Sequence, residues 1–286
     1  MPPSLSATFA PLPIVYRDDA LIVVHKPSGA LVHRSALDRD APQIVLQQLR
    51  DQIGQRVYPV HRLDRPTSGL LLFGLDSGIT AALAHEFSTH RVRKRYLAVV
   101  RGIGPESARL DWALREEDGT RPKHEMPAMP AITDVRRLDS IELPLSVDRY
   151  PTSRYSLMEA GPLTGRRHQI RRHLSRCGHP IIGDAKHGKG VHNRFFRDRY
   201  DAGRLLLAAV GLTFWHPRAE RTLCLSAPVE ANFAALLDRF GWTRHDPRHQ
   251  VDWQDDRPSP SVSFETHTDL LEPAALINNA INENIE

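Results

Sequence analysis

The sequence predicts an α+β fold, with a mixed or antiparallel central sheet and flanking helices and loops. Two observations lead to this prediction: segments with strand composition outnumber segments with helical periodicity, and the helical segments are scattered among the strands. The chain has 286 residues, of which 41% are hydrophobic and 25% charged. This composition is typical of globular proteins and fits one large domain or two smaller ones.

The N-terminal part of the chain is expected to combine short strands with two helices. Apolar residues recur at the spacing of one helical face between residues 43 and 53, and Ser77 offers an N-cap for a second helix. The run GLLLFG has the length and composition of a strand. The expected elements are strands at 14–16 and 21–25, a turn at 26–29, a helix at 43–53, a strand at 69–74, a helix at 77–87 and a strand at 95–102.

The C-terminal part contains a helix with a strongly basic surface. The run GRRHQIRRHLSRC places Ile170 and Leu174 on one side of a helix and arginines on the others, and Gly178 ends it. The polar segment 115–130, with its glycine and prolines, is expected to be an exposed loop within the domain. The further expected elements are strands at 155–159, 205–212 and 222–225, and helices at 165–177 and 230–240.

Charge and composition divide the chain into three parts. Residues 1–13, rich in Pro and Ser, are expected to form a loose leader, residues 14–244 one folded catalytic domain, and residues 245–286 an acidic, flexible tail. The first 244 residues contain 36 basic and 25 acidic residues, a net charge of +11, whereas the remainder contains 2 basic and 9 acidic residues, a net charge of −7. Any polyanion would repel such a tail, so we expect it to lie away from a surface that binds one.

Neither secretion nor membrane insertion is expected. No apolar run approaches the roughly 18 residues that span a bilayer, and the first residues lack both a basic start and a continuous apolar stretch. Cys177 and Cys224 are too few for a disulfide framework or a four-cysteine zinc site, and they fit a reducing compartment. The sequence therefore predicts a cytoplasmic protein.

The distribution of arginine predicts a polyanionic partner. The chain contains 33 Arg and only 5 Lys, and the segment from Arg149 to Arg199 holds 12 basic against 3 acidic residues. The planar guanidinium pairs with phosphates and stacks on bases, so this segment favours nucleic acid as the partner. An Arg-rich proteome is the alternative explanation, but it would distribute arginine evenly along the chain.

The segment YPVHRLDRPTSGLLLFGL contains the strongest candidate for chemistry. Asp64 lies between Arg62 and Arg65 in a polar loop that Pro66 and Gly69 restrict, directly before a buried strand. Such a carboxylate would be held as an anion and could act as a nucleophile. From these residues alone, a solvated ion pair is the more common interpretation.

The motif HRLDRPTSGLLL resembles the catalytic motif of the RluA-like pseudouridine synthases. Further segments match this family in the expected order between about residues 14 and 240: HKPSG (25–29), KRYLAVVRG (94–102), LTGRRHQIRRHL (163–174), HPIIGDAKHG (179–188) and LTFWHP (212–217). The resemblance implies the pseudouridine synthase catalytic fold and the isomerisation of a uridine in RNA, without a metal or an organic cofactor. Segments 31–40, 149–155 and 240–242 resemble the branch of the family that modifies uridine 65 of tRNA.

The resemblance also implies roles for individual residues. Asp64 would be the catalytic carboxylate, Arg166 its ion-pair partner, and Tyr96 the residue that stacks on the extruded uracil. Arg62 would help to fill the space that the base vacates. Alternatives stay open: Tyr96 as a core residue of a strand, Arg62 as a phosphate contact, and Arg167 as the partner of Asp64. The other residues expected to contact RNA are Arg65, Arg167, Arg171 and Arg172.

The expected partner is tRNA, and the protein is expected to act as a monomer. His61, His168 and His173 do not have the spacing of a zinc site, so we expect no metal. Ala208 stands where the family usually has a histidine, which would change the active-site floor if that histidine packs there. The alternative functions are a synthase that acts on ribosomal RNA and, from another class, a non-catalytic RNA-binding protein.

Overall fold

The structure is a computed structural model that describes residues 9–33, 43–115, 124 and 126–249. All of these residues belong to the first of two compact units, Met1–Trp253 and Gln254–Glu286. Most of the predicted tail, and the family segment at 31–40 beyond His33, lie outside the described residues. Among the described residues, no helix is both long and apolar enough to cross a bilayer.

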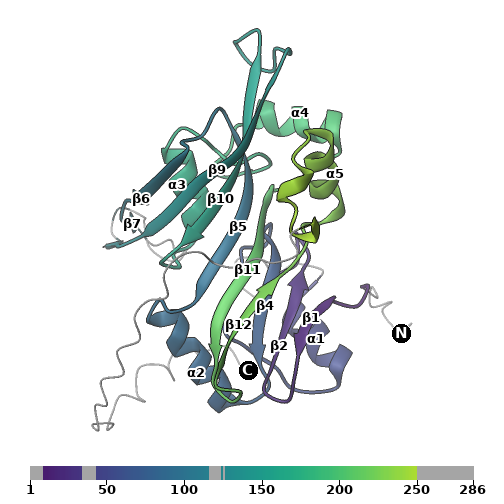
Figure 1. The fold of residues 1–286 in the computed structure, drawn as a ribbon, viewed down its shortest axis with the longest axis vertical. Coiled ribbons are helices and arrows are strands. Elements are labelled where there is room, and N and C mark those ends of the chain that lie inside the picture. Colours follow the sequence, from purple (N-terminus) through teal and green to yellow (C-terminus); the bar gives the residue numbers. More distant parts are fainter. Residues whose placement is uncertain (1–8, 34–42, 116–123, 125, 250–286) are drawn as a thin grey trace, which may run out of the picture. The chain divides into compact units, whose positions relative to one another are not determined.

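A ten-stranded mixed sheet forms the centre of this unit (Figure 1). Its strand order is β1-β2-β4-β11-β5-β10-β9-β6, with β3 paired to β4 and β12 paired to β11. The strands are antiparallel except for the pair of β4 and β11. The strands are β1 (Ile14–Arg17), β2 (Leu21–Lys26), β3 (Tyr58–Pro59), β4 (Ser68–Gly74), β5 (Arg93–Arg101), β6 (Ser107–Asp111), β9 (Ile132–Leu143), β10 (Ser153–Pro162), β11 (Leu207–His216) and β12 (Arg221–Ser226).

Helices cover both faces of the sheet because the central strands are apolar on both sides. Along β4, Leu71 and Phe73 pack with α1 (Val45–Ile53), whereas Leu70 and Leu72 pack with α2 (Ser77–Ser88) on the other face. The remaining helices are α3 (Gln169–Arg176), α4 (Gly190–Tyr200) and α5 (Ala231–Arg239).

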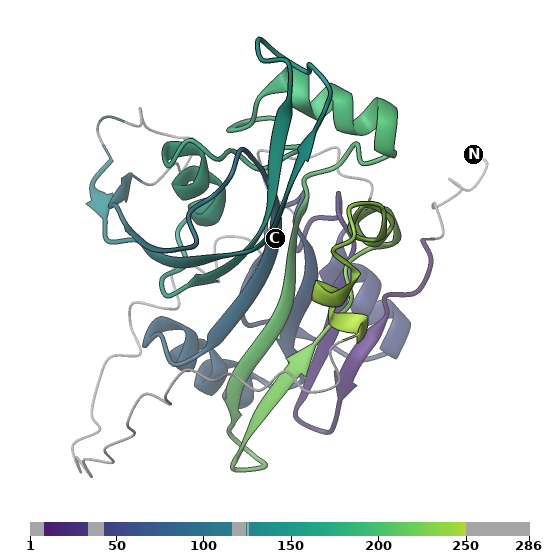
Figure 2. The same ribbon diagram turned by 45° about the horizontal axis from the view of Figure 1, so that its top comes forward.

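The side chains of β5 show how these remaining helices are divided between the faces. Leu97 and Val99 pack with α4 and α5, whereas Ala98 and Val100 pack with α3. The side chain of Tyr96 lies on the same face of the sheet as that of Ala98, two residues along the strand. It packs against both the buried side chains around α1 and those around α3. Strands β9 and β10 continue as a long hairpin that projects beyond α4 (Figure 1 and Figure 2). Helices α1 and α3 therefore flank Tyr96 on one face of the sheet.

The predicted fold class is confirmed, but several elements differ from the expectation. The N-cap of α2 is Asp76, not Ser77, since Asp76 Oδ1 accepts a hydrogen bond of 2.8 Å from the Ile79 amide. The helix predicted at 165–177 begins only at Gln169. Within the predicted loop 115–130, β7 (Leu114–Arg115) and β8 (Ala128–Met129) pair as a separate small sheet. Strands β6 and β9 and helix α4 were not predicted, because charged residues interrupt their apolar patterns.

The predicted domain boundaries also need adjustment. Leu12, which was placed in the leader, is buried, and its backbone exchanges two hydrogen bonds with the side chain of Gln52 on α1. At the other end, Asp246 is fully buried and binds Arg248. The folded part therefore begins before residue 14 and continues past residue 244.

Candidate active site

The turn at residues 26–29 holds the loop that carries Asp64. The buried Lys26 Nζ donates hydrogen bonds to the carbonyls of Arg65 (3.0 Å), Ala30 (2.7 Å) and Pro27 (2.9 Å). The Ser28 hydroxyl donates to the Pro66 carbonyl at 2.8 Å. Three donors of one ammonium group thus meet three carbonyls, which fixes the loop directly after Asp64.

Asp64 pairs with Arg171, not with Arg166 as predicted. Arg171 Nη1 lies 3.0 Å from Asp64 Oδ2, while its Nε and Nη2 donate to both oxygens of Asp184 at 2.7 and 2.8 Å. Arg171 is 5% exposed, Asp184 fully buried and Asp64 21% exposed. The Arg171 guanidinium therefore donates two hydrogen bonds to the buried carboxylate of Asp184 and a third to the partly exposed carboxylate of Asp64.

The late start of α3 explains this correction. The Gln169 side chain is fixed by the hydroxyls of Thr164 and Thr133, at 2.6 and 2.9 Å, so residues before Gln169 form a turn. Arg166 lies in this turn, and its Nε donates to the Pro130 carbonyl at 3.1 Å. Arg171 is on the buried side of the helix. The prediction therefore named the wrong arginine of the motif as the ion-pair partner of Asp64.

The pKa shifts of this ion-pair group follow from its burial and charges. Burial alone would lower the pKa of Arg171, but the carboxylates of Asp184 and Asp64 raise it overall. Burial would raise the pKa of Asp184, but hydrogen bonds from Arg171 and from the His187 amide lower it overall. Both groups of the buried pair are therefore charged.

A histidine pair lies beside this ion pair. His168 Nε2 is 3.9 Å from Asp64 Oδ2, and its Nδ1 is 3.0 Å from His187 Nε2. His168 has a φ of 54°, in the left-handed region that non-glycine residues seldom adopt. Burial is the main cause that lowers the pKa of His168 to about 4; Asp64 opposes this shift and Arg171 adds to it. The ring is therefore neutral near pH 7.

Tyr96 lies on β5 directly opposite Ala209 of β11, on the face that α1 and α3 flank. Burial raises its pKa, and the negative charge of Asp64 raises it further, so the phenol is neutral. Gly69, with a φ of 114°, permits the close approach of β4 to β11, because a Cβ there would lie 2.1 Å from the Ala209 carbonyl oxygen. Ala208 packs with α4 and α5 on the opposite face, so it is not part of the floor around Tyr96.

Of the residues that were predicted to contact RNA, Arg171 is buried against Asp64 and Asp184; the other four lie as follows. Arg62 is exposed. Burial is the main cause that lowers the pKa of His33, and the nearby positive charge of Arg62 lowers it further. Arg65 Nε donates to the Gly29 carbonyl at 3.1 Å. Arg167 lies beside His168, and Arg172 Nη1 donates to the Arg115 carbonyl at 2.9 Å.

Asp184, His187 and Lys26 are the participants that sequence reasoning missed. Each lies within a segment that carried the family resemblance, Asp184 and His187 in HPIIGDAKHG and Lys26 in HKPSG. Their motifs were therefore visible, but their contacts with Asp64 and its loop depend on the folded chain. Among the described residues, no group of three or more His, Cys, Asp or Glu side chains is arranged to hold a metal ion.

The arrangement provides an oriented anion at the edge of a partly open site. The neutral ring of His168 and the neutral phenol of Tyr96 border Asp64, and a single guanidinium is shared between two carboxylates. Such a site can stabilise positive charge that develops on a substrate atom, or attack that atom.

Comparisons with known proteins agree with this chemistry. Residues 20–176 match the family model described as RNA pseudouridylate synthase. The "tRNA pseudouridine synthase C" of Vibrio cholerae is 47% identical over 235 residues, which cover 81% of this chain and 96% of the relative. The protein of the same name from Haemophilus ducreyi is 44% identical over 234 residues, again covering 81% of this chain and 96% of the relative.

Solved structures give the same result. "Human RNA Pseudouridylate Synthase Domain Containing 1" is similar with a TM-score of 0.59 and 28% identity, covering 80% of this chain and 86% of that chain. "Human RNA Pseudouridylate Synthase Domain Containing 4" has a TM-score of 0.60 and 25% identity, covering 80% and 93%. The matched residues 20–176 include Asp64, Tyr96 and Arg171.

Proposed function

Because the chain belongs to the RNA pseudouridylate synthase family, we propose that it converts uridine 65 of tRNA to pseudouridine, with Asp64 as the catalytic carboxylate. The observation that carries this proposal is the ion pair of Asp64 with Arg171, next to the neutral phenol of Tyr96. The relatives are named as tRNA enzymes, which favours tRNA over ribosomal RNA as the substrate.

The reaction makes specific demands on the site. The bond between uracil N1 and ribose C1′ breaks, the uracil rotates, and C5 bonds to C1′; C5 loses a proton and N1 gains one, so no other reactant is consumed. Positive charge develops at C1′ as the glycosidic bond breaks, and a carboxylate can stabilise or capture it. Attack at C1′, removal of the 2′ proton and attack on the uracil ring all require the same ionised Asp64.

Neighbouring residues are assigned to binding and positioning. The target uridine must leave its helical stack before C1′ is accessible. We assign Tyr96 to stacking on the extruded uracil, Arg62 to the space that the base vacates, and Arg65, Arg167 and Arg172 to the RNA backbone. We further propose that the protein works as a monomer in the cytoplasm, where tRNA is modified. No organic cofactor or metal takes part in this proposal.

Replacement of Asp64 tests the role of the carboxylate. Asp64→Asn removes the charge and keeps the shape, so isomerisation should be lost while RNA affinity stays within a few-fold. Asp76→Asn, at the start of α2 on the other face of β4, is the matched control and should retain full activity. Turnover by pure Asp64→Asn protein, with deamidation excluded by mass spectrometry, would show that another residue performs the chemistry.

The substrate is tested separately, by mapping pseudouridine in tRNA and ribosomal RNA from cells with and without the gene. Loss of pseudouridine at position 65 of tRNA is the expected result. Loss at a ribosomal position instead, with tRNA unchanged, would contradict the substrate assignment and leave the reaction class intact.

A further inference from the structure

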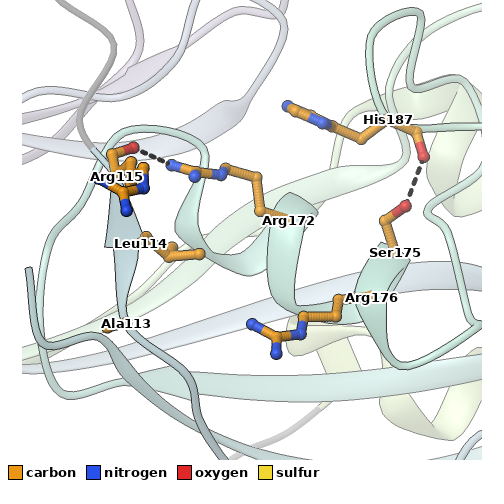
Figure 3. Close-up of a pocket in the computed structure, with 7 residues that line it drawn as sticks. All are labelled: Ala113, Leu114, Arg115, Arg172, Ser175, Arg176 and His187. Atoms are coloured by element: carbon orange, nitrogen blue, oxygen red, sulfur yellow. Dashed lines mark hydrogen bonds between the residues drawn. The ribbon is translucent and has the colours of Figure 1, made fainter. Parts of the chain in front are cut away.

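A cavity of about 360 Å³ lies beside the C-terminal half of α3, next to the candidate active site. Its described lining contains three arginines, one histidine and one serine, and none of these described residues is acidic (Figure 3). The lining residues are Ala113, Leu114, Arg115, Arg172, Ser175, Arg176 and His187.

The three arginines are held in place by neutral groups. Arg172 donates to the Arg115 carbonyl, Arg115 donates to the carbonyls of Met126 and His124, and the Arg176 guanidinium lies 4.9 Å from the centre of the Trp112 ring. In the part of the chain that the structure describes, none of these three guanidinium groups pairs with a carboxylate. Within the described residues, the positive charge of the cavity wall is therefore not neutralised by a carboxylate.

The same elements build the cavity and the candidate active site. Helix α3 presents Arg171 to Asp64, and the next residue, Arg172, to the cavity, about 100° further around the helix. His187, in the cavity wall, contacts His168 through its ring, and its amide donates to Asp184 at 2.9 Å. An anion in the cavity would thus be held at a fixed position relative to Asp64.

We propose that this cavity binds one backbone phosphate of the substrate RNA, close to the uridine that enters the active site. A phosphodiester is an anion that fits arginine forks, and it is present at every nucleotide next to the target. The proposal rests on the proposed function, because it takes RNA as the substrate. It assigns Arg172 and Arg176 to one phosphate and makes α3 the element that aligns the strand with Asp64.

Arginine variants measured against salt give the first test. Arg172→Gln and Arg176→Gln should each weaken RNA binding by roughly tenfold and should lower the slope of log affinity against log salt by at most about 0.7 to 0.9, the value for one phosphate. Arg239→Gln is the matched control: Arg239 is also exposed in the last turn of a helix and lies 5.1 Å from an aromatic ring centre, that of Tyr200, but on the face opposite Tyr96. Thermal unfolding should show that all three variants are folded.

Neutral phosphate analogues in the RNA give the second test and require no change in the protein. Substrates that carry a single methylphosphonate at each position around the target are measured with the wild-type protein and with Arg176→Gln. One position should weaken wild-type binding by roughly tenfold or more and should have a clearly smaller effect on Arg176→Gln, which keeps only Arg172 at that phosphate. Independent losses at every position would overturn the proposal, as would an unchanged salt slope in both cavity variants.

Two further controls separate the possible outcomes. Inorganic phosphate should compete only at millimolar concentrations; competition far below that would indicate a site for a free anion and overturn the RNA assignment. If the wild-type protein forms pseudouridine and the cavity variants bind RNA like Arg239→Gln, the cavity proposal alone is wrong. If the wild-type protein forms no pseudouridine in any RNA, the proposed function is wrong, and the methylphosphonate measurements still decide whether the cavity holds a phosphate.

Discussion

Arg171 determines the charge of the candidate active site. Its guanidinium is shared by two carboxylates, Asp64 and Asp184, and the neighbouring His168 is neutral, so this group of four residues has a net charge of −1 near pH 7. Asp184 is fully buried and accepts two hydrogen bonds from Arg171, whereas Asp64 accepts one from it and is partly exposed. The excess negative charge is therefore available at Asp64, where the ribose would lie.

A lysine cannot replace Arg171, because an ammonium group cannot reproduce the planar fork that spans Asp184 and Asp64. We expect Arg171→Lys to reduce the single-turnover rate by about 100-fold or more, since a misplaced catalytic group has effects of this size. RNA affinity should change much less, because the variant keeps its charge and Arg171 is almost fully buried. Single-turnover rates at saturating enzyme report this chemical step.

Arg166→Lys is the matched control for this measurement. Arg166 lies in the same motif, but its Nε bonds to the Pro130 carbonyl in the turn before α3. Its replacement should slow the chemical step only slightly. Equal effects of the two substitutions on the single-turnover rate would show that Arg171 has no special role in orienting Asp64.

The start of α3 is the element-level feature that sequence reasoning could not fix. The run GRRHQIRRHLSRC has helical periodicity throughout, and nothing in it distinguishes residue 165 from residue 169 as the first residue. The start depends on Thr133, from β9, which binds the side chain of Gln169. This contact joins residues far apart in the chain, and it decides which arginine reaches Asp64.

The N-cap of α2 gives a prediction at the scale of one element. Asp76→Ala removes the acceptor of the Ile79 amide and should lower the free energy of unfolding by about 1 kcal/mol, the usual cost of losing a helix cap. Asp76→Asn keeps an acceptor but loses the ion pair with Arg218, which is exposed and contributes little, so it should cost less. Urea unfolding measures both changes.

Catalysis should be unaffected in both variants, because α2 packs on the face of β4 opposite α1. If Asp76→Ala were as stable as Asp76→Asn, the cap would contribute nothing to α2. If either variant lost activity at a temperature where it is folded, the result would show that α2 affects the active site.

At the scale of the whole sheet, the candidate site depends on a strand order that local sequence does not encode. β11 comes from residues 207–216, yet it lies between β4 and β5 and brings Ala209 opposite Tyr96. β4, β5 and β11 themselves, and the loop that carries Asp64, could be predicted from their apolar runs and turn residues. The order could not, because parallel pairing of β4 with β11 joins segments separated by more than half of the folded chain. Asp184 was missed for another reason: it is only 13 residues from Arg171, but it lies in the loop after α3, where no periodic pattern indicates which side chains meet.

Buried neutral histidines give the whole molecule a specific dependence of stability on pH. Burial is the main cause that lowers the pKa of His61 to about 3, and those of His168 and His192 to about 4. His61 Nε2 accepts a hydrogen bond from the Leu72 amide, which requires the neutral ring. Unfolded histidines have a pKa of about 6.5, so between about pH 4 and pH 6.5 the unfolded chain binds more protons than the folded one.

We therefore expect the free energy of unfolding to decrease as the pH falls from 6.5 towards 4, by at most about 1.4 kcal/mol per pH unit for each such histidine. Asp18, whose pKa is lowered to about 2 by hydrogen bonds that outweigh its burial, should affect stability only below about pH 4, which separates its effect from that of the histidines.

His192→Gln removes one of these histidines, whose ring lies 2.9 Å from the Tyr155 hydroxyl, away from Asp64. This variant should be less stable at pH 7.5 but should lose less stability on acidification to pH 5. Urea unfolding at the two pH values measures both slopes, and wild-type stability that did not change between them would contradict the neutral state of these histidines.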